Sequence, residues 1–261
     1  MKRKFSLVFI LAMVLTIVAA CGADEKADSS SSEKESLVIG IDDTFAPMGF
    51  RDDNNEIVGF DIDLATAAAE HIGVDVTFQP IDWSTKESEL SSGRIDLIWN
   101  GYTVTEERKE KVLFTEPYLE NAQVVMTLED SKITALNDLA DKEVGIQALS
   151  SALDALNANP ISEEVTLNEY KDNVLALTDL KAGRVEAVVI DKVVGEYFMT
   201  QETDTFKILD ESLAPEQYAV GVKKGNEELL EKVQAALDAM NEDGTSTEIS
   251  TKWFGEDIVL K

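Results

Sequence analysis

Apolar positions follow two different periods along the chain, and the two periods predict different elements. Short apolar runs, such as Ile95 to Trp99 and Val185 to Ile190, are typical of strands buried inside a mostly parallel sheet. Between such runs, apolar residues recur every three or four positions, which is typical of amphipathic helices. One such helix opens at Gly59-Phe60-Asp61, with Asp61 as its expected cap, and ends at Gly73. The alternation of strands and helices predicts an α/β fold.

The same patterns place the remaining elements and indicate an internal repeat. Strands are expected at residues 37–41, 74–78, 123–126, 143–147 and 165–170, and helices at about 84–92, 174–182 and 227–240. The segment Gly93-Arg94-Ile95-Asp96-Leu97-Ile98 is echoed by Gly183-Arg184-Val185-Glu186-Ala187-Val188, each a helix end that leads into an apolar strand. The echo favours two similar α/β lobes over one continuous sheet.

Polar residues follow the strand that ends at Trp99, and they form the strongest candidate binding loop. Asn100, Gly101 and Thr103 offer amides and a hydroxyl just past the carboxyl end of that strand, where open α/β sheets place their ligands. Thr105 is expected to cap a short helix that holds Arg108. The planar guanidinium of Arg108 suits a carboxylate, which it can bind through two parallel hydrogen bonds.

The amino terminus carries an export signal. Lys2, Arg3 and Lys4 precede an apolar run from Phe5 to Val18, which is short for a membrane span but suits the core of a signal peptide at residues 1–20. The Val-Ala-Ala-Cys junction that ends at Cys21 resembles the lipobox of bacterial lipoproteins, which implies a lipid-modified Cys21. Residues 22–36 contain no large apolar side chain, so the segment 21–36 is expected to be a disordered tether.

Composition excludes several classes of function. The formal net charge of −28 argues against a nucleic-acid partner, because a phosphate backbone would be repelled. One Cys and one His cannot form a zinc site, and His71 stands near a helix end, where a surface role is expected. No metal and no cofactor are therefore expected.

The stretch from Ser91 to Tyr118 closely resembles the signature of the family 3 extracellular solute-binding proteins, the amino-acid receptors of ABC importers. In that family, Gly-(Lys/Arg)-Ile-Asp is followed by Thr-Ile-Thr-x-x-Arg-Lys, and the resemblance here runs from about Leu37 to Gly255. It implies a two-lobed, periplasmic-binding-protein-like (type II) α/β fold, with a ligand cleft between the lobes and two crossover hinge strands. Lobe 1 is expected at residues 37–121 plus 219–261, and lobe 2 at residues 122–218.

The resemblance also implies partners and a location. The expected partners are an amino acid as small-molecule ligand, an ABC permease and its ATPase subunits, and the only expected membrane contact is the lipid anchor. A monomer is expected on the extracytoplasmic face of the cell membrane of a Gram-positive bacterium.

The family pattern implies a set of ligand-binding residues in both lobes. Phe45 and Trp83 match the aromatic residues that cover the ligand side chain, Asp42 matches the acid near that side chain, and Asp191 matches the aspartate that receives the ligand ammonium. The full expected set is Asp42, Phe45, Trp83, Asn100, Gly101, Thr103, Arg108, Ser150, Ser151 and Asp191. Leu149 stands where the family has glycine, which is a departure because non-glycine residues tolerate a positive φ poorly.

Several alternatives remain open from the sequence. Asp191 can instead cap the helix that follows it, and Tyr102 can point into the core or into the site. The expected ligand is a polar amino acid such as glutamine or cystine, with a basic amino acid as the second choice. Some proteins of this fold are dehydratases, which need an acid or base beside the substrate. Glu120, near the expected crossover, is the only acid in this sequence that we consider a candidate for that role. We therefore expect a binding protein that is not an enzyme.

Overall fold

The computed structural model describes residues 36–261. The predicted signal peptide, Cys21 and the tether up to residue 35 lie outside the described residues. The strands are β1 (Ser36–Ile41), β2 (Thr44–Phe45), β3 (Gly49–Arg51), β4 (Ile57–Val58), β5 (Asp75–Pro80), β6 (Leu97–Ile98), β7 (Val112–Phe114), β8 (Leu119–Leu128), β9 (Glu143–Gln147), β10 (Thr166–Tyr170), β11 (Ala187–Asp191), β12 (Phe206–Tyr218) and β13 (Gly221–Lys223). The α-helices are α1 (Phe60–Ile72), α2 (Lys86–Ser92), α3 (Glu106–Lys111), α4 (Ser151–Asn157), α5 (Asn173–Lys181), α6 (Lys192–Gln201), α7 (Glu227–Asp243) and α8 (Thr245–Phe254), and the 3₁₀ helices are η1 (Trp83–Thr85), η2 (Leu136–Leu139) and η3 (Pro160–Glu163).

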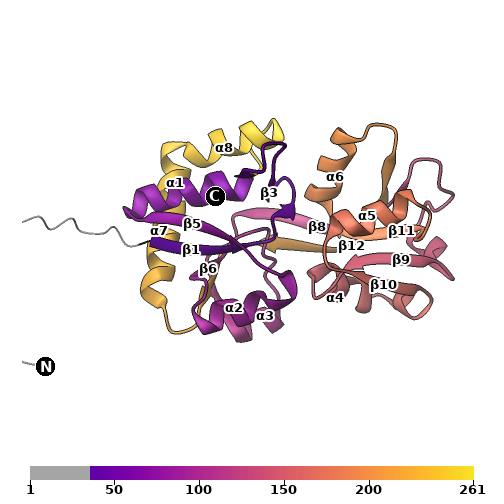
Figure 1. Cartoon of the computed structure of the whole chain (residues 1–261), viewed down its shortest axis with the longest axis horizontal. Helices are drawn as coiled ribbons and strands as arrows, with labels where there is room; N and C mark the ends of the chain where they lie inside the picture. Colours follow the sequence, from indigo (N-terminus) through magenta and orange to yellow (C-terminus); the bar gives the residue numbers. More distant parts are fainter. Residues whose placement is uncertain (1–35) are drawn as a thin grey trace, which may run out of the picture. The chain divides into compact units, whose positions relative to one another are not determined.

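Two five-stranded sheets organise these residues (Figure 1). The first sheet has the order β5-β1-β6-β13-β7, in which β1 is parallel to β5 and β6, and β13 is antiparallel to β6 and β7. The second has the order β10-β9-β11-β8-β12, in which β9 is parallel to β10 and β11, and β8 is antiparallel to β11 and β12. A small antiparallel sheet, β2-β3-β4, follows β1.

The long pair β8 and β12 connects the two sheets. The pair runs antiparallel from Leu119 opposite Tyr218 to Leu128 opposite Phe206. In chain order, β8 follows β7 of the first sheet, and β13 returns the chain to the first sheet three residues after β12 ends. Isolated bridges from Thr103 to Tyr218 and from Leu119 to Val259 join the ends of this pair to residues of the first lobe. The two sheets are therefore linked by paired strands at one place.

Alternating side chains place helices on both faces of the second sheet. Val188 and Ile190 of β11 belong to one hydrophobic cluster together with Ala176 and Leu177 of α5. Their neighbours Ala187 and Val189 point to the other face and join a second cluster, to which α4 contributes Ala152 and Leu156. Figure 1 shows the same arrangement, with α5 and α4 on opposite sides of this sheet. Because both faces are covered, β11 is buried along its whole length, as its uninterrupted apolar sequence predicts.

The first sheet is covered in the same way. Ile39 and Ile41 of β1 pack in the cluster that contains apolar residues of α1 and α7, whereas Ile98 of β6 packs with Leu90 of α2. Helix α1 ends at Gly73, whose φ of 84° is left-handed, so the predicted glycine C-cap is confirmed. The side chain of Thr105 accepts a hydrogen bond from the backbone N–H of Arg108, so the predicted cap of α3 is also confirmed.

Two expectations from the sequence were wrong. Asp61 does not cap α1, because Gly59 occupies the N-cap position and no side-chain cap bond forms there. The strand expected over residues 95–99 is regular only at Leu97–Ile98. The long strand β12 was not predicted, since its polar and apolar residues follow no regular alternation and its pairing partner β8 lies far earlier in the chain. Within residues 36–261, no helix combines the length and the apolar character needed to span a membrane.

Candidate functional site

Three hydrogen bonds join residues of the two lobes at the carboxyl ends of their strands. The hydroxyl groups of Thr103, which follows β6, and Ser151, at the start of α4, are 3.0 Å apart. Gln147 Nε2, at the end of β9, donates to Asp42 Oδ2 at 2.8 Å. Lys86 Nζ donates to the carbonyl oxygen of Leu149 at 2.9 Å. We call this region, with the ten predicted residues, the inter-lobe site.

Arg108 is fixed on α3 and is almost completely buried, with 5% of its surface exposed. Its Nη1 donates to the carbonyl oxygen of Thr103 at 2.9 Å. The guanidinium lies over the ring of Tyr102, 4.7 Å from the ring centre, and its Nε is 3.9 Å from Glu87 Oε1. Because a guanidinium has five N–H donors, the bond to Thr103 leaves most of the donating capacity available for a ligand.

The ring of Tyr102 packs against the guanidinium of Arg108, and the Tyr102 side chain is buried in the core of the first lobe. Its ring stacks on Phe114 at 5.2 Å between ring centres and meets the ring of Trp83 edge to face at 5.9 Å. Its hydroxyl donates to Glu87 Oε1 at 3.1 Å. Of the two orientations that the sequence left open, the Tyr102 side chain therefore adopts the one that points into the core.

Phe45 and Trp83 are both buried, but they contact different parts of the site. A Cβ atom on Gly101 would come within 2.7 Å of Phe45 Cε1, so glycine is needed for the ring to lie against this backbone. Gly101 also has a φ of 59°, in the left-handed region. Trp83 packs on Tyr102, and the ammonium of Lys86 lies over the Trp83 ring, 5.1 Å from the ring centre, in a cation–π contact.

Asp42 is buried and receives hydrogen bonds on both carboxylate oxygens. Oδ1 accepts from the backbone N–H of Thr44 at 3.0 Å and from the Thr44 hydroxyl at 2.7 Å, while Oδ2 accepts from Gln147. The backbone N–H of Asp42 donates to Asn100 Oδ1 at 3.1 Å, and Asn100 Nδ2 is buried without a partner among the described residues. Burial raises the pKa of the Asp42 carboxyl above its usual value.

Asp191 stands at the N-cap position of α6, but its side chain makes no cap bond. Its Oδ1 instead accepts from Asn121 Nδ2 at 2.9 Å, from Gln123 Nε2 at 2.9 Å and from the hydroxyl of Tyr218 at 2.5 Å. Burial, followed by the negative charge of Glu216, raises the pKa of Asp191 well above its usual value. The helix-cap interpretation is therefore excluded for the Asp191 side chain.

The two predicted serines have different partners. Ser150 caps α4 by accepting from the N–H of Leu153, and its hydroxyl donates to the carbonyl of Gln147 at 2.7 Å, so it is engaged within its own loop. Ser151 instead reaches Thr103 and accepts from Gln123 Nε2 at 3.3 Å. Leu149 has a φ of 53°, so the loop keeps a glycine-like backbone at a leucine.

Sequence reasoning missed several residues that hold this site. Asp61 Oδ2 accepts from the backbone N–H of Gly101 at 2.7 Å and from the hydroxyl of Tyr118 at 2.9 Å, and burial raises the pKa of Asp61 to about 7. Asn121, Gln123 and Glu216 surround Asp191 on the paired strands β8 and β12. Strand alternation would have placed these three on one face, had the register of β12 been known.

All ten predicted residues are buried in the structure, and the contacts link most of them. Arg108, Thr103, Ser151, Gln123 and Asp191 form one continuous chain of hydrogen bonds across the two lobes. A separate cavity of about 650 Å³ lies beside α6 and the C-terminal segment and includes none of the ten. Among residues 36–261, no group of three or more His, Cys, Asp or Glu side chains could hold a metal ion.

Comparison with known proteins agrees with this arrangement. The model of the bacterial extracellular solute-binding proteins, family 3, matches residues 37–256. The L-cystine-binding protein TcyJ of Escherichia coli strain K12 is 30% identical over 96% of this chain and 94% of its own length. The glutamine-binding protein GlnH of Bacillus subtilis is 30% identical over 98% of this chain and 99% of its own length.

A solved structure gives the same result. An ABC uptake transporter substrate-binding protein from Streptococcus pneumoniae with bound histidine has a TM-score of 0.84 and 43% identity, over 87% of this chain and 95% of that chain.

The chain belongs to the family 3 bacterial extracellular solute-binding proteins, the amino-acid-binding proteins of ABC importers. The predicted α/β, two-lobed type II fold is confirmed by the solved structures of this class. The relatives are solute-binding proteins and not enzymes. The roles of the ten site residues and the exact lobe boundaries stay predictions.

Replacing Asp61 should change how stability depends on pH. A carboxyl whose pKa is about 7 in the folded state and 3.8 when unfolded binds its proton more tightly in the folded state, so its contribution to stability is lost as pH rises between these values. Asp61→Asn should therefore gain stability relative to wild type as pH rises from about 4 to about 7, on the order of 4 kcal/mol, since one pKa unit equals about 1.4 kcal/mol.

Urea unfolding of both proteins at several pH values measures this difference. Glu70→Gln, an exposed substitution on the same helix, is the matched control and should follow the wild-type curve. A difference between Asp61→Asn and wild type that stays constant across this pH range would contradict the assignment.

Proposed function

We propose that this chain captures a polar L-amino acid, with glutamine and cystine as first candidates, by closing its two lobes around it and delivering it to a permease. The observation that carries the proposal is the continuous hydrogen-bonded chain from Arg108 to Asp191. It places a group suited to a carboxylate and a group suited to an ammonium at opposite ends of one buried polar network. A free amino acid has a carboxylate and an ammonium group bonded to the same carbon atom.

Arg108 is the proposed carboxylate site. Its guanidinium is oriented by the Thr103 carbonyl and by the ring of Tyr102, so little side-chain entropy remains to be lost when a ligand binds. The hydroxyls of Thr103 and Ser151, 3.0 Å apart, are in a position to add donors from both lobes. A carboxylate here would connect the lobes, which supports closure on the ligand because the closed state would be bound more tightly.

Asp191 is the proposed ammonium site, and Phe45, Trp83, Asp42 and Asn100 are proposed to surround the ligand side chain. The buried, unpartnered Nδ2 of Asn100 favours a ligand with a hydrogen-bond acceptor, because a buried donor without a partner costs about 1–3 kcal/mol. Lys86 is buried beside Trp83, and burial, followed by the charge of Arg108, lowers its pKa to about 8. Lys86 and Arg108 are both cationic groups in the site, and they would repel a positively charged ligand side chain, so they favour a neutral polar ligand.

A basic amino acid is the second candidate. Asp42 offers a buried carboxylate from the first lobe, and the S. pneumoniae relative was solved with bound histidine. The choice between neutral and basic ligands thus depends on whether Asp42 serves as a counter-ion or as a hydrogen-bond acceptor.

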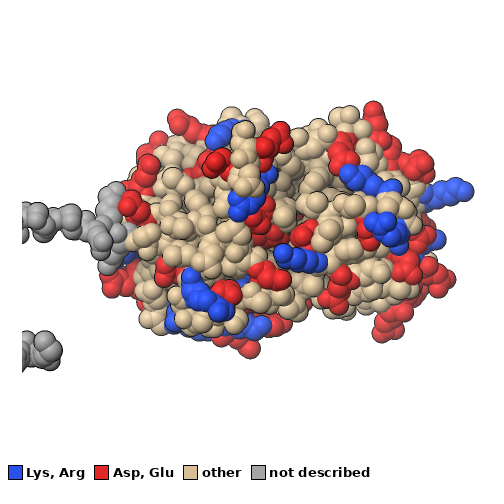
Figure 2. Space-filling model, viewed as in Figure 1, with Lys and Arg blue, Asp and Glu red and all other residues tan. Residues whose placement is uncertain are grey.

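Anchoring and assembly complete the proposal. A lipid on Cys21 would hold the protein on the extracytoplasmic face of the cell membrane, while the tether up to residue 36 would let it reach the permease. The surface has acidic and basic side chains spread over the face shown in Figure 2, with the strongly acidic balance of the whole chain. The proposed partners are the permease and ATPase subunits, and the proposed state is a monomer.

A calorimetric screen of glutamine, cystine, arginine, histidine and leucine tests this function. Glutamine or cystine should bind more tightly than leucine, because an apolar side chain would leave the buried Nδ2 of Asn100 without a partner. Leucine binding more tightly than all four polar amino acids would contradict both candidates.

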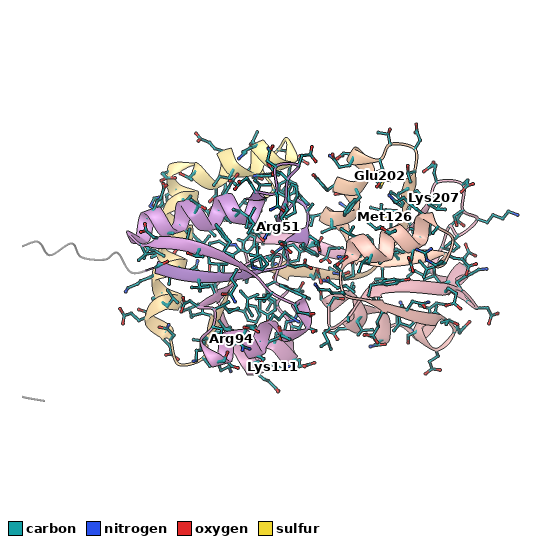
Figure 3. The ribbon with its side chains drawn as sticks, viewed as in Figure 1. Arg51, Arg94, Lys111, Met126, Glu202 and Lys207 are labelled. Carbon is teal, nitrogen blue, oxygen red and sulfur yellow. The ribbon has the colours of Figure 1, made fainter. Side chains whose placement is uncertain are left out.

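Arg108→Ala should reduce amino-acid affinity by about 100-fold, because two charge-assisted hydrogen bonds together contribute on the order of 3 kcal/mol. Arg108→Lys, which keeps the charge but loses the fork, should fall between this variant and wild type. Arg94→Ala is the matched control, since Arg94 is exposed and pairs with Glu89 on the outer surface of the first lobe (Figure 3).

Calorimetry on variants whose melting temperatures show that they are folded measures these affinities. An affinity of Arg108→Ala within about threefold of wild type would remove Arg108 from the carboxylate site.

Asp42→Asn should separate the two ligand candidates. The substitution keeps the volume and one acceptor oxygen, so glutamine affinity should change by less than about threefold, whereas the loss of a counter-ion should weaken arginine by about tenfold or more. The measurement is the ratio of glutamine to arginine affinity in both proteins. An unchanged ratio would mean that Asp42 does not face the ligand side chain.

A further inference from the structure

One face of the strand pair β8 and β12 carries an unusual set of polar residues. Asn121 and Gln123 alternate on β8, Glu216 lies opposite Asn121 on β12, and Tyr218 follows two residues later on the same face. Asp191 of the neighbouring strand β11 is paired with Gln123. Five polar side chains thus meet at the base of the inter-lobe site, and the family pattern pointed only to Asp191.

Asp191 and Glu216 share their hydrogen-bond donors. Asn121 Nδ2 donates to Asp191 Oδ1 at 2.9 Å and to Glu216 Oε1 at 2.6 Å, and Gln123 Nε2 is 2.9 Å from each of the same two oxygens. Two oxygens that lie this close to the same two nitrogens must also lie close to each other. The two carboxyl groups therefore form a pair.

The side chains that donate hydrogen bonds to this pair, among the residues that the structure describes, are all neutral. The donors Asn121 and Gln123 are neutral, and Tyr218 donates a neutral hydroxyl to Asp191. Within residues 36–261 no Lys, Arg or His forms an ion pair with either carboxyl, and Lys192, the next residue after Asp191, pairs with Glu196 on α6. Two carboxylates this close oppose each other's ionisation, and burial together with the charge of Glu216 raises the pKa of Asp191, so Asp191 is the group that retains the proton.

We propose that the ammonium group of the amino-acid ligand binds between Asp191 and Glu216 and replaces the proton that Asp191 retains. This inference rests on the function proposed above and adds Glu216 to the binding residues. The protonated pair carries one negative charge, and two carboxylates with one ammonium also carry one, so the local charge stays the same. The displaced proton passes to solvent.

The geometry supports this exchange. An ammonium has three N–H donors, and the pair offers carboxylate oxygens that already accept hydrogen bonds from the neutral donors Asn121 and Gln123. The raised pKa of Asp191, caused by burial and by Glu216, means that a proton is available for release at neutral pH. Ligand binding should therefore weaken as pH falls, by up to about tenfold per pH unit where one proton is released.

Calorimetry in two buffers of different ionisation enthalpy at the same pH counts the protons released. The probe is L-glutamine, or L-arginine if glutamine does not bind, because neither side chain titrates near neutral pH. Wild type should release a substantial fraction of one proton, up to about one, per ligand bound. The variant Glu216→Gln should still bind the same probe but should release clearly fewer protons than wild type, because removing the negative charge of Glu216 lowers the pKa of Asp191 even though its burial remains.

Glu120→Gln is the matched control. Glu120 is adjacent to Asn121 on the same strand, so strand alternation points its exposed side chain to the opposite face, and this variant should release as many protons as wild type. Binding without proton release in wild type, or equal release from Glu216→Gln, would overturn this inference and leave the proposed function intact. Failure of every amino acid in the screen to bind would overturn both.

Discussion

The antiparallel pairing of β8 with β12 is the constraint on which the inter-lobe site depends. This pair carries the chain from the first sheet to the second and back, so it fixes where the two lobes can approach each other. Its register also places Asn121 and Gln123 beside Glu216 and Tyr218. The pairing of β8 with β11 places Asn121 and Gln123 beside Asp191, and the register of β12 adds the hydroxyl of Tyr218, so this buried carboxyl receives the donors that a low-dielectric interior requires. The same hydrogen bonds that build the hinge thus satisfy the residue proposed to receive the ligand.

Buried charge is distributed across the site so that each group has a partner. Arg108 is held by a carbonyl and an aromatic ring, Lys86 by the carbonyls of Trp83 and Leu149, and Asp42 by Thr44 and Gln147. Two of these partners, Leu149 and Gln147, belong to the other lobe. Because unpaired buried polar groups cost free energy, contacts of this kind couple the separation of the lobes to what occupies the space between them.

The sequence predicted the elements whose cause is local. The glycine at Gly73, the cap at Thr105 and the uninterrupted apolar run that ends at Asp191 depend on neighbouring residues only, and the structure agrees with each. The family pattern implied ten residues that are all buried, and four of them, Arg108, Thr103, Ser151 and Asp191, belong to one chain of hydrogen bonds through Gln123.

Sequence reasoning failed where the cause is a contact between distant segments. Asp61 has the residue type and position of a helix cap, yet its carboxylate holds Gly101, forty residues away. Strand β12 mixes polar and apolar residues irregularly and contains Pro215, so no apolar period marks it, and the position of Glu216 depends on pairing with β8. Leu149 takes up a left-handed φ that its residue type alone argues against, because the surrounding loop and the bond from Lys86 hold it there.

A crystal structure with bound L-glutamine, or with L-arginine if calorimetry favours it, tests most directly that the inter-lobe site is the binding site. The predicted result is a ligand whose carboxylate contacts Arg108 and whose ammonium lies within hydrogen-bond distance of both Asp191 and Glu216. A ligand found instead in the cavity beside α6, with the contact of Thr103 to Ser151 and those of Asp191 unchanged, would contradict it.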